Sequence, residues 1–295
     1  MKRMLLAMIM GCAAAVAAAQ QGALLVSELL YQPLSGEAEY VELYNATDAT
    51  VDLSGYHIVR VLHDSLTTHY PLPSCPLPPH SYVALSKDIG SVRSCFNTAP
   101  GALLLECQLP TYPNDGGSVV LATADSTIID RFDYAPALHS RLLRNKAGVS
   151  LERRRFDRPT AEASNWFSAS STCGYGTPGS ANSQSSEWFV AESDFDFSST
   201  LLSPDGDGYQ DELVISYRLD EGDLAARIDI HDAHGMPVRR LLNNALLGTH
   251  GSLVWDGLGS DGTRLPEGQY IIQITVYDTT GTRQTLRRAV ALTVR

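Results

Sequence analysis

The chain has 295 residues, a formal net charge of −11 and a hydrophobic fraction of 44%. An acidic surface repels polyanions, so the composition argues against general nucleic-acid binding, and no specific nucleic-acid partner is expected. The length suffices for two domains with separate hydrophobic cores.

The N-terminus has the three parts of a secretory signal peptide. Lys2 and Arg3 precede an apolar stretch at 4–10, and a run of small residues then ends at Ala19. This pattern predicts a signal peptide at 1–19 and therefore an exported protein. Loss of Lys2 and Arg3 changes the formal net charge from −11 to −13. No later stretch is long and apolar enough to cross a bilayer, so the mature chain is predicted to have no transmembrane segment.

Cys12 leaves a second route of processing open. Ile9-Met10-Gly11-Cys12 resembles a bacterial lipoprotein box, in which the cysteine becomes the acylated first residue. Met10 is unusual in such a box, and the residues after Cys12 are apolar. Ordinary cleavage after Ala19 is therefore preferred, with lipid anchoring at Cys12 as the alternative.

The segment 20–184 is predicted to be a β-sandwich domain. Its apolar and β-branched runs are short, they are bounded by turn residues, and no window shows a sustained helical period. The expected strands are Ala23–Leu30, Ala38–Asn45, Tyr56–Leu62, Ser81–Ser86, Ser118–Thr123 and Thr127–Tyr134. Many short strands at regular spacing are typical of a sandwich or a barrel.

Motifs of this segment occur in the order found in lamin-tail domains. They are the runs at 26–31, 39–45, 51–56 and 77–83, the turn Asn114-Asp115-Gly116-Gly117 followed by Val119 and Asp130, and the closing runs at 150–153 and 174–179. The segment therefore resembles a bacterial lamin-tail domain over nearly its whole length. The resemblance implies an immunoglobulin-like sandwich that serves as an interaction module, and it implies no catalytic chemistry.

Four cysteines follow the predicted signal peptide. They are Cys75, Cys95, Cys107 and Cys173. An even number in an exported chain predicts disulfides, with three connectivities open and at least one bridge expected within the region of the first three cysteines. No Cys-x-x-Cys pair occurs, which argues against a zinc or redox site.

A basic cluster stands out from the acidic background. Its members are Arg141, Arg144, Lys146, Arg153, Arg154, Arg155 and Arg158. Guanidinium groups suit phosphate, so the cluster could receive a phosphate-bearing partner. The preferred interpretation is a solvated end of the sheet, partly neutralised by Glu152, Asp157 and Glu162.

A serine-rich stretch ends the first domain, and 185–187 is the predicted linker. The second domain, 188–295, shows clear alternation at 213–219, 270–276 and 290–294, the pattern of half-buried antiparallel strands. The run Ser203–Asp211 and the later Trp255-Asp256-Gly257 with 265–270 resemble the immunoglobulin-like domain of the flagellar hook-capping protein FlgD. The resemblance implies a sandwich used for assembly or attachment. The fold class is thus all-β, with two immunoglobulin-like sandwiches in tandem.

Asp205, Asp207 and Asp211 have the spacing of a calcium loop. Hard cations bind several oxygens, and these carboxylates could supply some of them. Tyr209 occupies the place of a third side-chain ligand and no glutamate follows at position twelve, so the ligand set is short. The alternative is a turn in which the aspartates accept backbone amides. Calcium is the one cofactor considered, and no other is expected.

No nucleophile elbow, phosphate-binding loop or dinucleotide fingerprint occurs. The sequence therefore predicts no enzyme but a non-catalytic envelope or cell-surface interaction module, within an outer-membrane or type IX secretion-associated complex. Its expected partners are other envelope or outer-membrane proteins. Two alternatives stay open, an adhesin that binds glycans or matrix and an exported hydrolase with an unrecognised site.

Overall fold

The computed structural model describes residues 22–185 and 195–293. The predicted signal peptide, Cys12, residues 186 and 187 of the predicted linker and the last strand position Val294 lie outside these ranges. No helix in the described part of the chain is long and apolar enough to cross a membrane.

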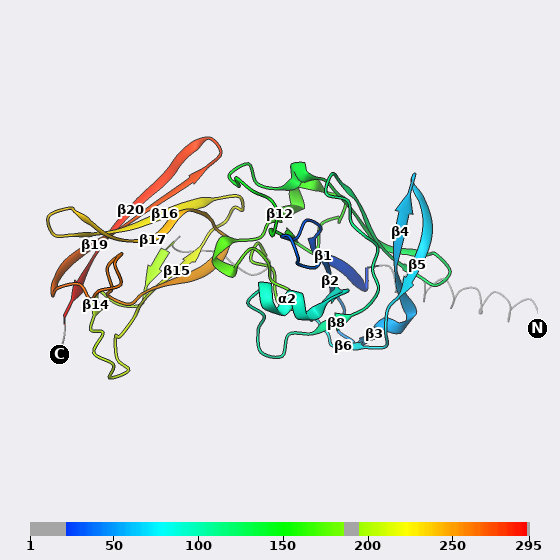
Figure 1. The fold of residues 1–295 in the computed structure, drawn as a ribbon, viewed down its shortest axis with the longest axis horizontal. Coiled ribbons are helices and arrows are strands. Elements are labelled where there is room, and N and C mark those ends of the chain that lie inside the picture. The colour runs from blue at the N-terminus through cyan, green and yellow to red at the C-terminus, as the bar shows by residue number, and fades with distance from the viewer. Residues whose placement is uncertain (1–21, 186–194, 294–295) are drawn as a thin grey trace, which may run out of the picture. The chain divides into compact units, whose positions relative to one another are not determined.

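The chain forms two compact units that interleave along the sequence. The first comprises residues up to His139 together with Lys146–Phe167 and Gly176–Asn182. The second comprises Ser140–Asn145, Ser168–Tyr175 and the chain from Ser183 onward. Both are built almost wholly of strands, as expected for immunoglobulin-like sandwiches (Figure 1).

A six-stranded sheet forms one layer of the first unit. Its order is β12-β11-β1-β2-β7-β8. The strands are β12 (Trp166–Ser168), β11 (Leu151–Arg153), β1 (Leu24–Leu30), β2 (Tyr40–Asn45), β7 (Tyr82–Ser86) and β8 (Leu104–Glu106). β1 runs antiparallel to both β11 and β2, β2 runs antiparallel to β7, and β8 runs parallel to β7.

A four-stranded sheet of order β10-β9-β4-β5 forms the second layer. Its strands are β10 (Ile128–Tyr134), β9 (Gly117–Thr123), β4 (Tyr56–Leu62) and β5 (Ser65–Pro71), and a two-stranded ladder joins β3 (Val51–Asp52) to β6 (Pro76–Leu77). β1 packs against β9 and β10. Apolar side chains of both layers, among them Val41, Leu121 and Phe132, form the core. Burial of each such side chain contributes about 1.5–3 kcal/mol.

The outer face of the six-stranded sheet is also covered. All positions of β1 and β2 are buried, so these strands lack the usual alternation. Short 3-10 turns connect the elements at η1 (Leu53–Gly55), η2 (Pro136–Leu138), η3 (Ala163–Asn165) and η4 (Ser171–Cys173). The helix α2 (Ile89–Cys95), capped by Asp88, contributes Val92 to a small cluster with Tyr40 and Phe96. The sequence predicted no helix, because seven residues are too few to show a helical period.

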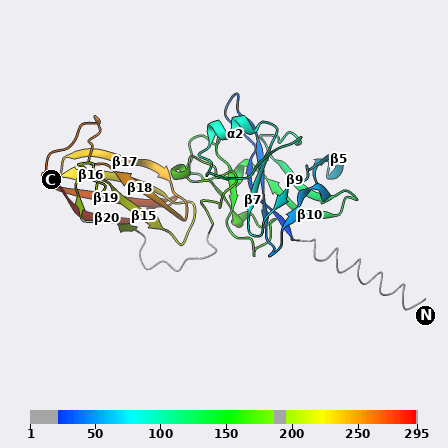
Figure 2. The ribbon, with the colours of Figure 1, turned by 90° about the horizontal axis from the view of Figure 1, so that it is seen from below.

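The second unit is a sandwich of two sheets (Figure 2). The first has the order β13-β15-β18, with β13 (Phe195–Phe197), β15 (Leu213–Arg218) and β18 (His250–Trp255). The second has the order β14-β20-β19-β16-β17. Its strands are β14 (Leu201–Leu202), β20 (Gly281–Leu292), β19 (Gly268–Asp278), β16 (Ala225–Asp232) and β17 (Pro237–Leu246). The alternating residues of β15 and β19 face one core around Trp255, as their periodicity predicts.

Segments expected in the first domain pack within the second unit. Ser170 Oγ donates to the carbonyl of Leu246 at 3.2 Å, and Gln184 Nε2 donates to that of Leu247 at 3.1 Å. The compact units therefore differ from the predicted domains in these stretches, because their polar groups bond to residues much later in the chain.

Candidate functional site

Three glutamates lie in a row across the outer face of the six-stranded sheet. Glu42 of β2 and Glu152 of β11 are both cross-strand partners of Glu28 in β1. A register irregularity after Val26 changes the alternation, so Val26 and Leu29 both reach the core while Glu28 takes the outer face. All three carboxylates are fully buried.

A short segment, called here the strap (residues 176–182), supplies hydrogen-bond donors to this row. The backbone amide of Thr177 donates to Glu28 Oε1 at 3.0 Å, and that of Gly179 donates to Glu42 Oε2 at 2.7 Å. Asn182 Nδ2 donates to the carbonyl of Ser27 at 3.0 Å. The strap thus covers the glutamate row through two main-chain amides and the hydroxyl of Thr177, and Asn182 binds it to the backbone of β1.

The strap needs a glycine where it meets the sheet. A Cβ at Gly176 would lie 2.5 Å from the ring of Phe96 and 2.6 Å from the hydroxyl of Tyr40. Because contacts below 3.0 Å are sterically forbidden, any side chain at this position must displace the strap or the aromatic rings.

Burial sets the electrostatics of the row. Desolvation, and next the charge of Glu28, raise the pKa of Glu42 well above its usual range. Desolvation also raises the pKa of Glu28, but hydrogen bonds from Ser150, Thr177 and Tyr40 oppose that rise. The ionised form of Glu28 is therefore better stabilised by hydrogen bonds than that of Glu42.

Sequence reasoning did not single out this row. Glu39, which precedes β2, lies outside the row. Glu39 Oε1 accepts the amide of Tyr112 at 3.1 Å, whereas Glu42 faces the strap. The sequence does carry one signal of the row. Glu28 is the single charged residue of the run 24–30, and this run has no alternating polar positions that would place a glutamate on a solvent-exposed face.

The aspartates predicted to bind calcium do come together. One oxygen each of Asp205, Asp207 and Asp211 lies within 4.8 Å of the others. Both carboxylate oxygens of Asp211 nevertheless accept amides, from Gly206 at 2.6 Å and from Gly208 at 2.8 Å. These bonds, in that order, lower the pKa of Asp211.

The other two aspartates of this loop also accept amides. Asp205 Oδ1 accepts that of Asp207 at 3.1 Å, and Asp207 Oδ1 accepts that of Tyr209 at 2.8 Å. The turn interpretation thus accounts for the arrangement, and calcium binding stays a prediction.

The bridge expected among the first three cysteines is not formed in the structure. Cys75, Cys95 and Cys107 have free thiols. Cys75 lies in the main core with Cys107 packed against it, whereas Cys95 belongs to the cluster beneath α2. Burial raises the pKa of Cys107 to about 11. Cys173 Sγ donates to the carbonyl of Ser170 at 3.1 Å. The disulfide prediction has therefore still to be tested on exported protein.

The basic residues do not converge on one anion site. Arg153 is only 2% exposed, and its Nη1 lies 3.4 Å from Asp130 Oδ2 in a buried ion pair. Arg155 pairs with Asp157 and Arg158 with Glu162, both at 2.5 Å.

The remaining members of the basic cluster are dispersed. The guanidinium of Arg154 lies over the ring of Phe167, and Lys146 donates to the carbonyl of Pro136. Arg141 and Arg144 are exposed and belong to a segment of the second unit. Arg153 and Glu152 are buried, which differs from the preferred interpretation of a solvated region, whereas Asp157 and Glu162 do pair with basic members of the cluster. Binding of a phosphate-bearing partner stays an untested alternative.

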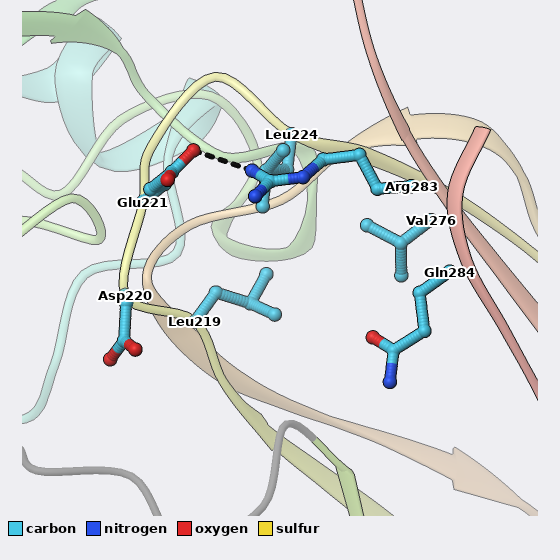
Figure 3. A pocket seen from close by; sticks show the side chains of 7 residues that line it. All are labelled: Leu219, Asp220, Glu221, Leu224, Val276, Arg283 and Gln284. Carbon is cyan, nitrogen blue, oxygen red and sulfur yellow. Dashed lines mark hydrogen bonds and ion pairs between the residues drawn. The ribbon is translucent and has the colours of Figure 1, made fainter. Parts of the chain in front are cut away.

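A shallow cavity of about 290 Å³ opens between strand ends of the second unit (Figure 3). An ion pair between Arg283 and Glu221 stands beside it, over the apolar side chains of Leu219, Leu224 and Val276. Asp220 and Gln284 complete the lining, which contains no serine, cysteine or histidine.

Solved structures with similar arrangements share little sequence with the chain. FlgD from P. aeruginosa is 20% identical with a TM-score of 0.24, over 34% of this chain and 67% of FlgD. Latent PorU from Porphyromonas gingivalis is 9% identical with a TM-score of 0.28, over 92% of this chain and 20% of PorU. PorZ of the same organism, a surface component of its type IX secretion system, is 11% identical with a TM-score of 0.24, over 91% of this chain and 38% of PorZ.

The chain thus spans only a minor part of PorU and PorZ, and at these TM-scores no argument rests on the likeness. No curated protein matches the chain. Residues 17–136, less than half of the sequence, match the family model of the Lamin Tail Domain. The matched region contains most of the motifs on which the resemblance of the first domain rests.

Proposed function

We propose that the chain is a non-catalytic, exported envelope or cell-surface protein that serves as an interaction and assembly module. Three observations support the proposal: the signal-type N-terminus, the Lamin Tail Domain match and the construction of both units from open sheets that end in edge strands. The observation that carries it is the edge strand β18 of the second unit.

β18 is a regular and uncharged edge. It lies at the end of its sheet and pairs with β15 over six residues without a register shift. Its solvent face presents Ser252 and Val254, and the side chain of Val254 is 47% exposed. The outer backbone amides and carbonyls of such a strand can pair with an added strand.

Three other edge strands, β17, β10 and β5, carry features that discourage strand addition. β17 contains Pro237, Arg239 and Arg240 and has three register irregularities against β16. β10 contains charged residues and a further irregularity. β5 is uncharged, but it pairs with β4 through an irregularity and ends at Pro71. β18 lacks all of these devices, which natural proteins use to keep edges unpaired.

The partner that fits this edge is an extended, uncharged segment of another envelope protein, bound mainly by main-chain hydrogen bonds. Membership of an outer-membrane or type IX secretion-associated complex, and a FlgD-type identity for the second domain, are further parts of the proposal. The module then works by holding its partners in place.

A matched pair of variants tests this function on intact cells. Ser252→Lys places a charge on the edge strand, whereas Ser216→Lys places the same charge directly opposite it on the inner strand β15. After crosslinking, purification and mass spectrometry, we expect envelope partners with the wild type and Ser216→Lys and their loss with Ser252→Lys.

Three outcomes contradict the proposal. Equal recovery of partners from both variants excludes the β18 edge. A freely secreted monomer with turnover on hydrolase substrates indicates the enzyme alternative, and recovery of host glycans or matrix proteins indicates the adhesin.

A further inference from the structure

The glutamate row of the first unit places like charges side by side without solvent. Glu28 lies between Glu42 and Glu152 in register, and none of the three is exposed. Across the described ranges, neither Glu28 nor Glu42 forms an ion pair, and the nearby Arg153 pairs with Asp130 instead. Buried carboxylates in this situation take up protons, because desolvation and mutual repulsion both disfavour the charged forms.

The hydrogen-bond donors around the row are unevenly distributed between Glu28 and Glu42. Glu28 Oε1 accepts from Tyr40 at 2.8 Å, from the Ser150 hydroxyl and from the Thr177 amide. The hydroxyl of Thr177 lies 3.2 Å from Glu28 Oε2 and 2.9 Å from Glu152 Oε1, although it has one hydrogen to donate. Glu28 is thus well supplied with donors.

Glu42 is poorly supplied. Its Oε2 accepts the amide of Gly179, and a hydrogen bond from the Ser27 side chain also acts to lower its pKa, but its Oε1 is buried with no hydrogen-bond partner. A buried ionised oxygen without a partner costs far more than a neutral one. A proton shared in the row therefore belongs on Glu42, beside the charge of Glu28.

We propose that Glu42 holds a proton while the strap is closed, and that its loss at higher pH loosens the strap, so that the row acts as a pH-sensitive latch. The titratable groups facing Glu42 are Glu28 from β1, Glu152 from β11 and Tyr40 from β2 itself. The residues around them in the cluster beneath α2 are apolar, among them Ala84 of β7, which is the cross-strand partner of Glu42, and Phe96, which follows α2. The inference concerns the first unit alone and does not depend on partner binding.

The sign of the pH dependence follows from the raised pKa of Glu42. At a pH above 4.5, the ordinary pKa of a glutamate, Glu42 is still protonated in the closed state but is ionised in the open state. Closure is therefore most favourable below about pH 4.5 and weakens as pH rises toward the pKa of the closed state. For one linked proton the closure constant falls about tenfold per pH unit within this window.

Hydrogen exchange measures the latch directly, because the amides of Thr177 and Gly179 donate into the row. Protection factors of the strap, corrected for intrinsic exchange, should fall with pH in the wild type. In Glu42→Gln, a neutral isostere, protection should persist and the slope should vanish.

Two further variants control the experiment. Glu39→Gln makes the same change at a carboxylate that accepts the amide of Tyr112 outside the row, and it should leave the slope of the strap unchanged. Gly176→Ala supplies the open-strap reference, since its Cβ cannot fit against Phe96 and Tyr40.

A wild-type protection factor that stays constant as the pH is raised from 5 overturns the latch without requiring any variant to fold. A slope that remains in Glu42→Gln overturns the assignment to Glu42. Protection that depends on added calcium or magnesium and not on pH shows that the row binds a cation instead.

Discussion

The hydroxyl of Thr172 lies 2.8 Å from the phenolic oxygen of Tyr217, an almost fully buried residue of β15. Thr172 belongs to a stretch that the sequence places in the first domain, yet it completes the core of the second. Each compact unit is therefore assembled from segments that are not continuous in the sequence.

A fragment that begins at residue 188 should be less stable than one that begins at residue 168. The shorter fragment lacks, among others, the bonds of Ser170 to Leu246, of Gln184 to Leu247 and of Thr172 to Tyr217. These three hydrogen bonds correspond to about 1.5–4.5 kcal/mol in the free energy of unfolding. Urea denaturation of both fragments measures the difference, and Thr172→Val in the longer one should remove part of it. Equal midpoints would show that 168–175 is not part of the second unit.

Asp211→Asn should lower the unfolding temperature at pH 7 in the presence of a chelator, and by more than Asp207→Asn does. Asp211 accepts two amides, whereas Asp207 accepts one at 2.8 Å. The pKa of Asp211 is lowered from 3.8, so its contribution is present above that pH and is lost as the pH falls below it. Differential scanning fluorimetry from pH 7 downward follows this loss. If calcium raises the unfolding temperature and either variant abolishes the rise, the loop is a cation site.

Arg153→Leu should reduce the free energy of unfolding by about 3–5 kcal/mol, because it leaves Asp130 buried without its partner. Arg155→Ala, which breaks an exposed pair with Asp157, should cost about 0–1 kcal/mol. Urea unfolding of the two variants at pH 7 provides the comparison. A similar small effect of both changes would mean that Arg153 is solvated, as a phosphate-binding residue must be.

In native protein at pH 8, Cys107 should be alkylated very slowly, because its pKa of about 11 leaves little thiolate. Iodoacetamide labelling followed by peptide mass spectrometry measures the rate at each cysteine. The same experiment on exported, denatured protein tests the disulfides, since labelling that appears only after reduction identifies a bridge. Two or more thiols reactive without reductant would contradict the disulfide prediction.

The strands of the first domain were predictable because their signals are local. Expected strands such as Ala38–Asn45 and Ser81–Ser86 agree with β2 (Tyr40–Asn45) and β7 (Tyr82–Ser86) to within two residues. Turn residues and β-branched runs mark such elements wherever the chain later packs. The Lamin Tail Domain match rests on the same local motifs.

The sequence by itself determined the all-β class and the aspartate loop, since period-two alternation and an Asp-x-Asp spacing need no distant partner. Only the tertiary structure decided the glutamate row, because an irregularity after Val26 turns Glu28 outward and the strap arrives from more than 140 positions away. It also decided that Arg153 is buried while Arg155 is exposed. Residue type gives a side chain its charge, but the elements that cover it decide whether that charge meets water.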